Sequence, residues 1–403
     1  MADFFQLDSF IAEHVIKRPE SLFTGDLQAF GQRLYENIHG KSMLVIGGAG
    51  TIGSSFIKAA LPYGPGKLVV VDINENGLTE LVRDCRSAVG LTLPADFKSY
   101  PVNFSDKVFK KLFLAEGPFD IVANFAAHKH VRSEKDAFSI EAMVENNVLR
   151  AKEFLDLLLE YPPAHFFCVS TDKAANPVNI MGASKKLMEE VIMAYSTRLK
   201  ITTARFANVA FSNGSLLAGF FERMLKKQPL SCPSDVRRFF VSPAESGQIC
   251  LMACVLGDAG DIFFPRLDMD NDLTSFASIV EPFLRQFGYG MEVCGSEQEA
   301  RQKAAGLRGE NYPVYFFKSE TSGEKLYEEF YTDEEAPVMD RFKSLGVIKV
   351  NNRKTIAEVE AVVDEIKALF DTGVAKEDIV VLLRKLLPGF HHIETGLNLD
   401  QKM

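Results

Sequence analysis

Asp172 and Lys173 are adjacent in the sequence and can together act as an acid and a base. They follow the apolar run 166–170, which has the length and composition of a buried strand. In α/β proteins the active site forms past the carboxyl ends of the strands, so this placement indicates proton transfer. A lysine must be partly neutral to act as a base, and burial or the nearby cation Lys185 can lower its pKa. The alternative is an exposed Asp-Lys pair in a turn.

A second chemical signal is the glycine-rich stretch at residues 43–53. Gly47, Gly50 and Gly53 directly follow a short apolar run, and a stretch of helical length comes next. Glycines at this spacing allow a tight turn, and the helix N-terminus then faces a pyrophosphate. Asp72 ends the next apolar run, where a carboxylate accepts hydrogen bonds from ribose hydroxyls and repels a 2′-phosphate. The pattern favours NAD over NADP; the alternatives are a structural glycine turn, and a turn or cap role for Asp72.

Short apolar runs alternate with stretches of helical length, such as residues 141–159. This alternation predicts βαβ units, a parallel sheet and helices on both of its faces. We therefore expect an α/β fold with a Rossmann-type doubly wound parallel sheet. The predicted strands are residues 43–46, 68–71, 121–124, 166–170 and 201–206.

Changes in composition divide the chain into four parts. Residues 1–41 have helical spacing and are predicted to form an N-terminal helical extension. Residues 42–207 are predicted to form the NAD-binding domain, which part of 239–265 completes. Pro and Gly become more frequent in residues 208–350, which we expect to form mainly a smaller, interleaved substrate-binding lobe. Residues 351–403 are predicted to be a C-terminal helical extension.

The composition is that of an ordinary globular protein. The chain has 403 residues, of which 47% are hydrophobic and 25% charged, so it can bury a sizeable core. Its net charge of -9 disfavours non-specific binding of nucleic acid. The N-terminus carries acids where a signal peptide needs basic residues, and the most apolar stretch, 249–256, is far shorter than the roughly 20 residues that span a bilayer. We therefore expect no membrane partner. The six cysteines have no metal-type spacing, and we expect them to be buried thiols in the reducing cytoplasm.

The GxxGxxG spacing resembles the extended short-chain dehydrogenase/reductase superfamily, and two further motifs narrow the resemblance. Asn124-Phe-Ala-Ala-His-Lys-His-Val131 begins at the end of the predicted strand 121–124, and Ser170-Thr-Asp-Lys-Ala-Ala-Asn-Pro-Val-Asn-Ile-Met-Gly-Ala-Ser-Lys185 begins at the end of the predicted strand 166–170. Together they closely resemble bacterial nucleotide-sugar 4,6-dehydratases of the polysaccharide-biosynthesis group, which act on N-acetylhexosamine nucleotides. The resemblance runs from about residue 42 to residue 345.

The resemblance implies roles for individual residues. Lys173 is then the base at C5 of the sugar, Asp172 is the acid at C6, and Thr171 contributes hydrogen bonds. Lys185 is implied to bind the nicotinamide ribose, against the alternative of a solvent-facing helical lysine. The implied cofactor contacts are Gly47, Gly50, Thr51, Ile52, Gly53, Asp72, Asn103, Ala126, Ala127 and Lys185.

One position departs from the superfamily, whose usual Tyr-x-x-x-Lys pair is Met181 and Lys185 here. Of the ten tyrosines only Tyr63 has a lysine four residues later, and it lies in a Pro/Gly turn that cannot present both side chains from one helix face. The methionine variant occurs in one branch of the dehydratases, and we expect Met181 to fill the space beside the substrate. The base for the C4 hydroxyl stays open between Asp172 and a bound water.

The same resemblance indicates a nucleotide-sugar site in the 208–350 lobe. The stretch 205–215 resembles RFGNVxxSxGS, which places Asn208 on the substrate phosphates and Ser215 nearby. Arg237-Arg238-Phe-Phe resembles TRYF and places Arg238 on the pyrophosphate, which an arginine can bind with two hydrogen bonds. The alternative for Arg238 is a solvated residue at a helix entry.

Two local features leave the substrate partly open. Residues 319–329 match the family's RPGEKLYEEL only from Gly323 onward, and Thr321 stands where an arginine is usual, so uridine and guanosine sugars both remain candidates. His128, Lys129 and His130 are expected to line the substrate cleft. The His-x-His spacing alone does not make a metal site, and we expect no metal because no third ligand is evident.

The sequence therefore predicts an NAD-dependent dehydratase that converts UDP- or GDP-N-acetylglucosamine to the 4-keto-6-deoxy sugar. The alternatives are a nucleotide-sugar epimerase and a non-catalytic NAD-binding protein. We also expect a homo-oligomer. Two apolar helices, at 356–370 and 379–387, suggest that the C-terminal extension docks on a neighbouring subunit.

Overall fold

The computed structural model describes residues 5–307, 309–319, 323, 325, 327–350, 353–373 and 375–394. Thr321, where an arginine was expected, lies outside the described residues. So does the end of the C-terminal extension, from residue 395 onward.

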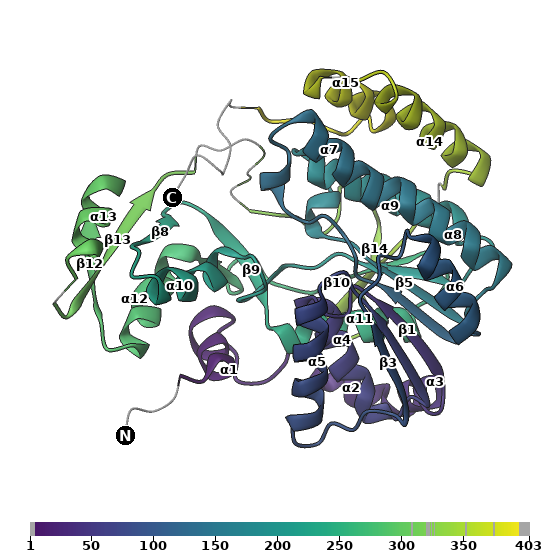
Figure 1. Cartoon of the computed structure of the whole chain (residues 1–403), viewed down its shortest axis with the longest axis horizontal. Coiled ribbons are helices and arrows are strands. Elements are labelled where there is room, and N and C mark those ends of the chain that lie inside the picture. Colours follow the sequence, from purple (N-terminus) through teal and green to yellow (C-terminus); the bar gives the residue numbers. More distant parts are fainter. Residues whose placement is uncertain are drawn as a thin grey trace.

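A large sheet forms the centre of the molecule (Figure 1). Its strands are β1 (Ser42–Ile46), β2 (Lys67–Val71), β3 (Asp96–Tyr100), β4 (Ile121–Asn124), β5 (His165–Val169), β6 (Ile201–Ala204), β10 (Asp261–Pro265), β14 (Pro337–Val338) and β15 (Leu345–Lys349). Within the described residues the nine strands lie in the order β14-β15-β10-β6-β5-β4-β1-β2-β3. All neighbours from β3 to β10 pair in parallel, whereas β15 is antiparallel to both of its neighbours. This arrangement confirms the predicted Rossmann-type sheet.

The direction of winding reverses at β1, which fixes the position of the site. Met43 of β1 pairs with Leu68 of β2 on one side and with Ile121 of β4 on the other. In such sheets the crevice past the carboxyl ends of the strands at the reversal is where ligands bind. The loops after β1, β4 and β5 meet at this edge, and these loops carry the motifs found in the sequence.

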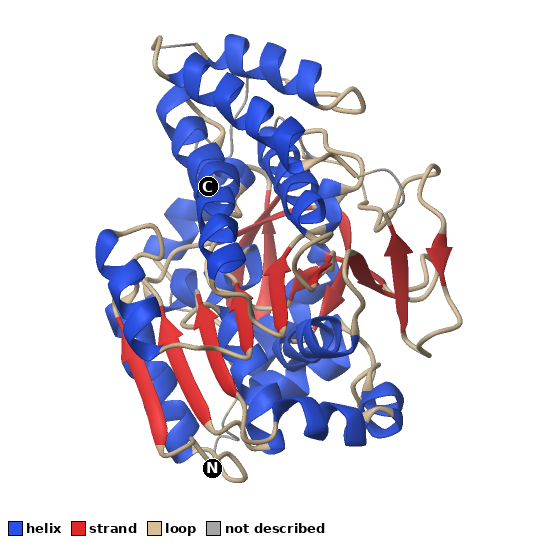
Figure 2. Cartoon of the chain, turned by 90° about the vertical axis from the view of Figure 1, so that its right-hand side faces the viewer, coloured by secondary structure: helices blue, strands red, loops and turns tan. Residues whose placement is uncertain are grey.

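Helices cover both faces of the sheet (Figure 2). On one face lie α3 (Gly31–Ile38), α4 (Thr51–Ala60), the short η2 (Leu61–Tyr63), α5 (Glu75–Ser87) and α11 (Pro243–Leu256). On the other face lie α6 (Lys107–Glu116), α7 (Ala137–Val144), α8 (Arg150–Glu160) and α9 (Ile180–Tyr195). The turn η4 (Glu145–Leu149) joins α7 to α8, and the short η3 (Val131–Ser133) and η5 (Asp172–Ala174) come after β4 and β5 in the chain. The predicted helix at 141–159 is thus one continuous stretch, in which η4 is a π-helical turn.

Helix α11 shows why an apolar stretch too short for a membrane occurs in this chain. Residues 249–256 are buried on all sides, because the helix lies between the sheet and the helices α3 and α4. At Gly247 a Cβ atom would overlap the backbone of Ser55 in α4, so α11 and α4 are in direct backbone contact there. Among the described residues no helix is long and apolar enough to cross a membrane.

A smaller lobe has its own sheets and its own core. Its helices are α10 (Leu216–Leu225), α12 (Phe276–Gln286) and α13 (Glu297–Ala305). Phe283 of α12 contacts the rings of Phe10, Phe211, Phe220 and other phenylalanines, so phenylalanine fills this core. The strands are β7 (Asn208–Val209), β9 (Arg237–Val241) and β11 (Leu273–Ser275) in one sheet, and β8 (Leu230–Pro233), β13 (Asn311–Phe317) and β12 (Gly290–Cys294) in the other.

The N-terminal segment is helical and divides between the two cores. Its elements are α1 (Leu7–Phe10), η1 (Ile11–Val15), α2 (Thr24–Ala29) and α3. Phe10 and Val15 are buried in the core of the smaller lobe, whereas Leu34 and Ile38 belong to the core of the large sheet. Between them, Arg18 donates to Glu245 of α11 at 2.9 Å and to Asp272 of the smaller lobe at 3.4 Å. The segment therefore connects the lobes instead of extending away from them.

The C-terminal helices pack on their own chain. They are α14 (Ile356–Phe370) and α15 (Lys376–Leu386), and both contact α9, while α15 also contacts α7 (Figure 1). Beyond α15, the backbone N–H of Ile393 donates to Val178 O at 2.9 Å, and Gly323 N–H donates to Ile393 O at 3.0 Å. The described part of the extension thus packs against α7 and α9 of the same chain, and its docking on a neighbouring subunit stays a prediction.

Replacing Gly247 by alanine tests the contact between α11 and α4. Alanine normally favours a helix over glycine by about 0.5–1 kcal/mol, but here its Cβ forces two backbones apart. We expect Gly247→Ala to lower the free energy of unfolding in urea by about 1–3 kcal/mol. Gly219→Ala in α10 is the matched control, since nothing lies within 4 Å of its added Cβ. Equal stability of the two variants would contradict the described packing.

Candidate active site

The loop after β1 has the shape of a phosphate cradle. Gly47 has a positive φ of 73°, and a Cβ there would lie 2.6 Å from the backbone nitrogen of Ala126, after β4. A Cβ at Gly53 would overlap the Gly47 carbonyl oxygen. Gly50 caps the N-terminus of α4, and Thr51 and Ile52 are the first two residues of that helix. Backbone N–H groups at such a helix start can bind a pyrophosphate.

Asp72 stands directly after β2 and supports this cradle. Its Oδ2 accepts a hydrogen bond from Ala49 N at 2.9 Å, and its Oδ1 accepts one from Asn74 N at 2.9 Å. Each carboxylate oxygen has a second lone pair, so these bonds leave acceptor capacity for ribose hydroxyls. The structure thus brings Asp72 to the phosphate loop. Asn103 lies on the loop after β3, where its Oδ1 accepts from Ser105 N at 3.1 Å in a local turn.

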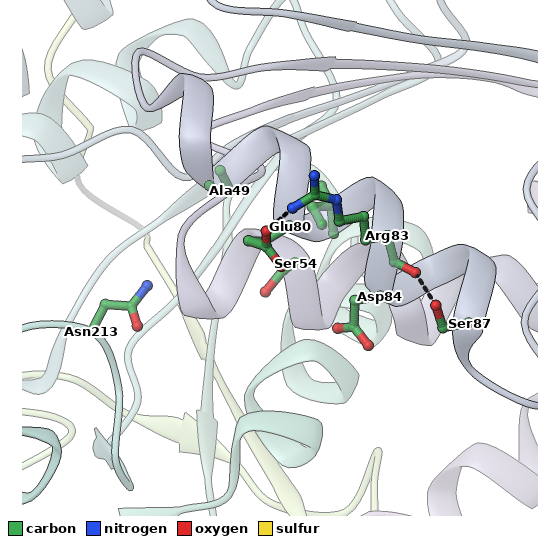
Figure 3. A pocket seen from close by; sticks show the side chains of 9 residues that line it. Ala49, Ser54, Glu80, Arg83, Asp84, Ser87 and Asn213 are labelled. Carbon is green, nitrogen blue, oxygen red and sulfur yellow. Dashed lines mark hydrogen bonds and ion pairs between the residues drawn. The ribbon is translucent and has the colours of Figure 1, made fainter. Parts of the chain in front are cut away.

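A groove of about 660 Å³ lies beside the phosphate loop, between α4 and α5 (Figure 3). Arg83 and Glu80 form an ion pair on its α5 wall, and Asn213 stands opposite. Its lining residues are Ala49, Ser54, Gly77, Glu80, Leu81, Arg83, Asp84, Ser87 and Asn213. None of the residues predicted to react or to bind the cofactor lines it, so this groove does not mark the reacting centre.

The loop after β4 is held by Asn147, which sequence analysis missed. Ala126 and Ala127 are half-buried, whereas the side chains of the 128–130 loop are exposed. Asn147 in η4 accepts from His128 N and donates to His128 O, both at 2.9 Å, and it also donates to Ser184 Oγ of α9 at 3.0 Å. Its side chain therefore fixes the loop backbone against α9. An asparagine within an apolar helical stretch was the available signal.

Two residues of that loop reach the 205–215 stretch. Lys129 Nζ donates to Asn213 O at 3.0 Å, and a Cβ at Gly214 would lie 3.0 Å from the His130 ring. Asn213 N in turn donates to Thr51 Oγ1 at 3.0 Å. The 128–130 loop is thus connected to Thr51, at the start of α4, through Asn213.

The Asp172–Lys173 pair lies where β5 ends, in the short helix η5. Asp172 is buried, and its Oδ1 accepts from Thr171 Oγ1 at 2.8 Å, from Lys173 N at 2.9 Å and from Lys173 Nζ at 3.1 Å. On its other side Lys173 Nζ lies 3.8 Å from Oε1 of Glu328, a carboxylate that is 4% exposed. Lys173 therefore sits between two buried carboxylates.

This setting corrects the expected electrostatics of Lys173. Burial and Arg238 act to lower the pKa of Lys173, but the nearby Asp172 and Glu328 outweigh them, and the net effect is a raised pKa. The prediction that its pKa is lowered was wrong for this arrangement. It failed because Glu328 comes from a distant segment that could not be placed beside Lys173 from the sequence.

Met181 and Lys185 are one turn apart on α9, so their side chains lie on one helix face. Met181 is buried, at the position where the superfamily has tyrosine. Lys185 is buried too, and its Nζ donates to Val169 O of β5 at 2.8 Å. Burial lowers the pKa of Lys185. Lys185 is therefore not the solvent-facing lysine of the alternative interpretation.

The predicted substrate residues fall into two groups. Arg238 on β9 is buried and donates to Lys325 O at 2.9 Å. Its positive charge acts to lower the pKa of both Lys173 and Glu328. Asn208 is on β7 in the same small sheet, where it pairs with Phe240. Ser215 instead caps α10 by accepting from Ala218 N, and it lies at the end of the loop that touches Thr51. Arg238 thus lies near Asp172, Lys173 and Glu328, Asn208 lies in the same small sheet, and Ser215 lies towards the phosphate loop.

A buried ion-pair network lies next to the loop after β5. Arg205 is fully buried, and its guanidinium donates to Glu189 of α9 at 2.7 and 2.9 Å and to Glu335 at 2.7 and 2.9 Å. It also donates to Phe330 O at 3.0 Å. Glu189 accepts in addition from Ser170 Oγ at 2.6 Å, so the network contacts the residue that precedes Thr171.

Comparison with known proteins identifies the family of this chain. Residues 43–350 match the family described as "Polysaccharide biosynthesis protein". The chain belongs to this family. The chain is related to nucleotide-sugar dehydratases and epimerases.

Three curated relatives illustrate the range of the family. An uncharacterized membrane protein of Methanocaldococcus jannaschii is 30% identical over 76% of this chain and 85% of its own length. A UDP-N-acetylglucosamine 4,6-dehydratase (inverting) of Campylobacter jejuni is 27% identical over 61% of this chain and 72% of its own. A UDP-glucose 4-epimerase of Rickettsia felis is 26% identical over 74% and 80%. The chain spans only 53% and 47% of two further relatives, from Bacillus subtilis and Staphylococcus aureus.

Among solved structures, Pen from Bacillus thuringiensis superposes with a TM-score of 0.63. The match covers 82% of this chain and 98% of that one, with 20% sequence identity. At this identity the likeness supports the fold alone.

Glu134 provides a pH test of the site. It is buried, and its Oε2 accepts from Ile180 N at the start of α9 at 2.6 Å, while Oε1 has no hydrogen-bond partner among the described residues. Burial raises the pKa of Glu134 from 4.5 to about 7; the Ile180 N–H and Lys376 act the other way, and Glu394 raises it further. The carboxyl group is thus favoured in its neutral form.

A raised carboxyl pKa stabilises the fold fully below pH 4.5, and that contribution is lost as the pH rises through 7. We expect the free energy of unfolding of the wild type to fall by roughly 2.5 kcal/mol relative to Glu134→Gln between pH 5 and pH 8. The measurement is urea unfolding at several pH values, with the exposed Glu160→Gln as control. Parallel pH dependences in the wild type and Glu134→Gln would contradict the raised pKa.

Proposed function

We propose that this chain is an NAD-dependent 4,6-dehydratase of a nucleotide-linked N-acetylhexosamine, converting UDP- or GDP-N-acetylglucosamine to the 4-keto-6-deoxy sugar. The observation that carries the proposal is the Asp172–Lys173 pair past the end of β5, close to Lys185 on α9. Loss of water from C6 needs an acid and a base side by side, and this pair supplies both.

The residues around the phosphate loop fit a dinucleotide. A side chain at Gly47 would fill the cradle against Ala126, and the carboxylate of Asp72 stands where it disfavours a 2′-phosphate. NAD, when bound, supplies hydride acceptance from C4 and hydride donation to C6. Lys185 has its ammonium at the end of β5, where it can exchange its bond to Val169 O for one to the nicotinamide ribose.

Asp172 and Lys173 can together carry all the protons that the reaction releases and consumes. Oxidation at C4 releases the hydroxyl proton, and the C6 hydroxyl must gain a proton to leave as water. Asp172 can accept the first proton and donate it in the second step, which makes it our choice for the base that Met181 cannot be. Lys173 removes the C5 proton and returns it after hydride reaches C6, so no net proton is left on the protein.

We expect the substrate to be a sugar nucleotide, because a buried arginine, Arg238, lies near Lys173 in a chain of acidic net charge. Arg238 would bind the pyrophosphate with two hydrogen bonds, and Asn208 belongs to the neighbouring strand β7. The exposed 128–130 loop, which bonds to the 205–215 stretch, would close over the substrate from the other side. Both uridine and guanosine nucleotides fit this description.

A 4-epimerase is the second candidate, and the Rickettsia felis relative favours it. Epimerisation at C4 needs hydride transfer but neither a base at C5 nor an acid at C6, so it leaves the Asp172–Lys173 pair without a role. A non-catalytic NAD-binding protein would leave the pair without a role as well.

Incubation of the purified protein with UDP- and GDP-N-acetylglucosamine, followed by NMR of the sugar products, separates the candidates. A 4-keto-6-deoxy sugar supports the dehydratase, whereas a C4 epimer contradicts it in favour of the epimerase. NAD binding without any change of either sugar supports the non-catalytic candidate.

Replacement of Lys173 tests its assignment as the C5 base. We expect Lys173→Ala to lower kcat for dehydration by about 10²–10⁴-fold, the usual contribution of a positioned base. C4 oxidation uses other groups, so NADH should accumulate during the first turnover. Lys318→Ala, an exposed lysine of the smaller lobe, is the control. Full dehydration by Lys173→Ala would rule out the assignment.

A further inference from the structure

Lys173 lies between two carboxylates that come from different parts of the chain. Its Nζ is 3.1 Å from Asp172 Oδ1, its sequence neighbour, and 3.8 Å from Glu328 Oε1, which lies on the segment between β13 and β14. The side chains of Asp172 and Glu328 are 2% and 4% exposed, and that of Lys173 is 18% exposed. Three ionisable groups thus share one nearly dry pocket.

The charges that face Glu328 come from three elements. Lys173 and Asp172 belong to η5, Arg238 belongs to β9, and Lys325 is on the same segment as Glu328. Burial and Asp172 raise the pKa of Glu328, while Lys173, Arg238 and Lys325 lower it, and the net effect is a raised pKa. Glu328 is therefore a carboxylate with an increased tendency to take up a proton.

Lys173 in its resting state is unsuited to act as a base. With a raised pKa it is an ammonium ion, which has no lone pair to accept the C5 proton. Lys173 must first give up one proton to become an amine. Asp172 cannot accept that proton, because it is already needed for the C4 and C6 hydroxyls. A further acceptor is required, and among the described residues Glu328 is the other carboxylate in an ion pair with Lys173.

We propose that Glu328 is the proton-exchange partner of Lys173, a positioning residue that converts its ammonium into the amine required at C5. This inference rests on the proposed dehydratase function. One proton moves from the Lys173 ammonium to the Glu328 carboxylate and leaves an amine and a carboxylic acid. The amine takes the C5 proton, later returns it to C5, and finally recovers its own proton from Glu328, so both residues end as they began.

Substrate binding supplies the reason for the transfer. A sugar seated over Lys173 excludes water, and a dry environment disfavours an ion pair relative to a neutral amine and acid. The separation of 3.8 Å is longer than a hydrogen bond, and catalytic contacts of this kind commonly shorten when substrate binds. Glu328 is a second carboxylate beside Lys173, so it can hold the proton while Asp172 remains free to act on the hydroxyls.

The test compares Glu328→Gln with Glu329→Gln, an exposed neighbour that bonds to Asn176. We expect Glu328→Gln to lower kcat at neutral pH by about 10²-fold with little change in KM. In this variant only solvent can take the proton of the Lys173 ammonium. Because this loss becomes easier as the pH rises, kcat should recover at high pH. Glu328→Asp should restore part of kcat at neutral pH, and Glu329→Gln should behave as the wild type.

Two outcomes overturn the proposal. One is a Glu328→Gln variant with the wild-type kcat and pH profile. The other is a loss of kcat that is equal at every pH, accompanied by a lower unfolding temperature and no rescue by aspartate, because that pattern indicates a purely structural role.

A second readout does not depend on turnover. NMR titration of lysine side chains labelled with ¹³C at Cε, with the Lys173 signal assigned from Lys173→Ala, reports the pKa of Lys173 directly. We expect this pKa to fall in Glu328→Gln and to stay unchanged in Glu329→Gln. If the wild type dehydrates neither sugar but this shift occurs, the dehydratase function fails while the coupling of Glu328 to Lys173 stands. If the shift does not occur, the proposal about Glu328 fails whatever the activity.

Discussion

Arg205 has no exposed surface, and its guanidinium bonds to two carboxylates and a carbonyl from two distant parts of the chain. Burying such a charge is costly unless every donor finds an acceptor, and removing one partner of a buried pair usually costs several kcal/mol. Arg205 lies just after β6, Glu189 is on α9, and Phe330 and Glu335 follow Glu328 on the segment between β13 and β14. The network therefore fixes, relative to one another, the helix of Lys185, the loop of Asp172 through Ser170, and the segment of Glu328.

Much of the fold and of the cofactor loop could be predicted from the sequence, because both depend on local patterns. Strands β1, β2, β4, β5 and β6 are apolar runs, and the glycine spacing specifies a turn that only glycine can make. Strand β3 has no such run: it reads Asp-Phe-Lys-Ser-Tyr at the end of the sheet, where no strand pairs with its outer side among the described residues. A strand of this kind is specified by its neighbour β2 more than by its own composition.

The parts of the site that could not be predicted are those that depend on long-range contacts. Glu328 and Lys173 are far apart in sequence, so the direction in which the pKa of Lys173 is shifted could not be predicted from its sequence neighbours. Asn147 has the same character, since a polar side chain on a buried helical turn indicates a partner but not which one. The docking of α14 and α15 on α9 is a third case, because an apolar helix face does not specify whether the same chain or another one covers it.

The contacts of residues 391–393 have a consequence for the order of assembly. These residues bond to the strand-like stretch before α9 and to Gly323, and they are synthesised after every other segment that they contact. Chains fold largely from the N-terminus as they are made. The strands β1 to β6 can therefore form while translation continues, but the segments that carry Glu328 and Asn179 receive their last hydrogen bonds only once residue 393 is available. For the proposed NAD-dependent enzyme, this order separates cofactor loading from the onset of turnover in time.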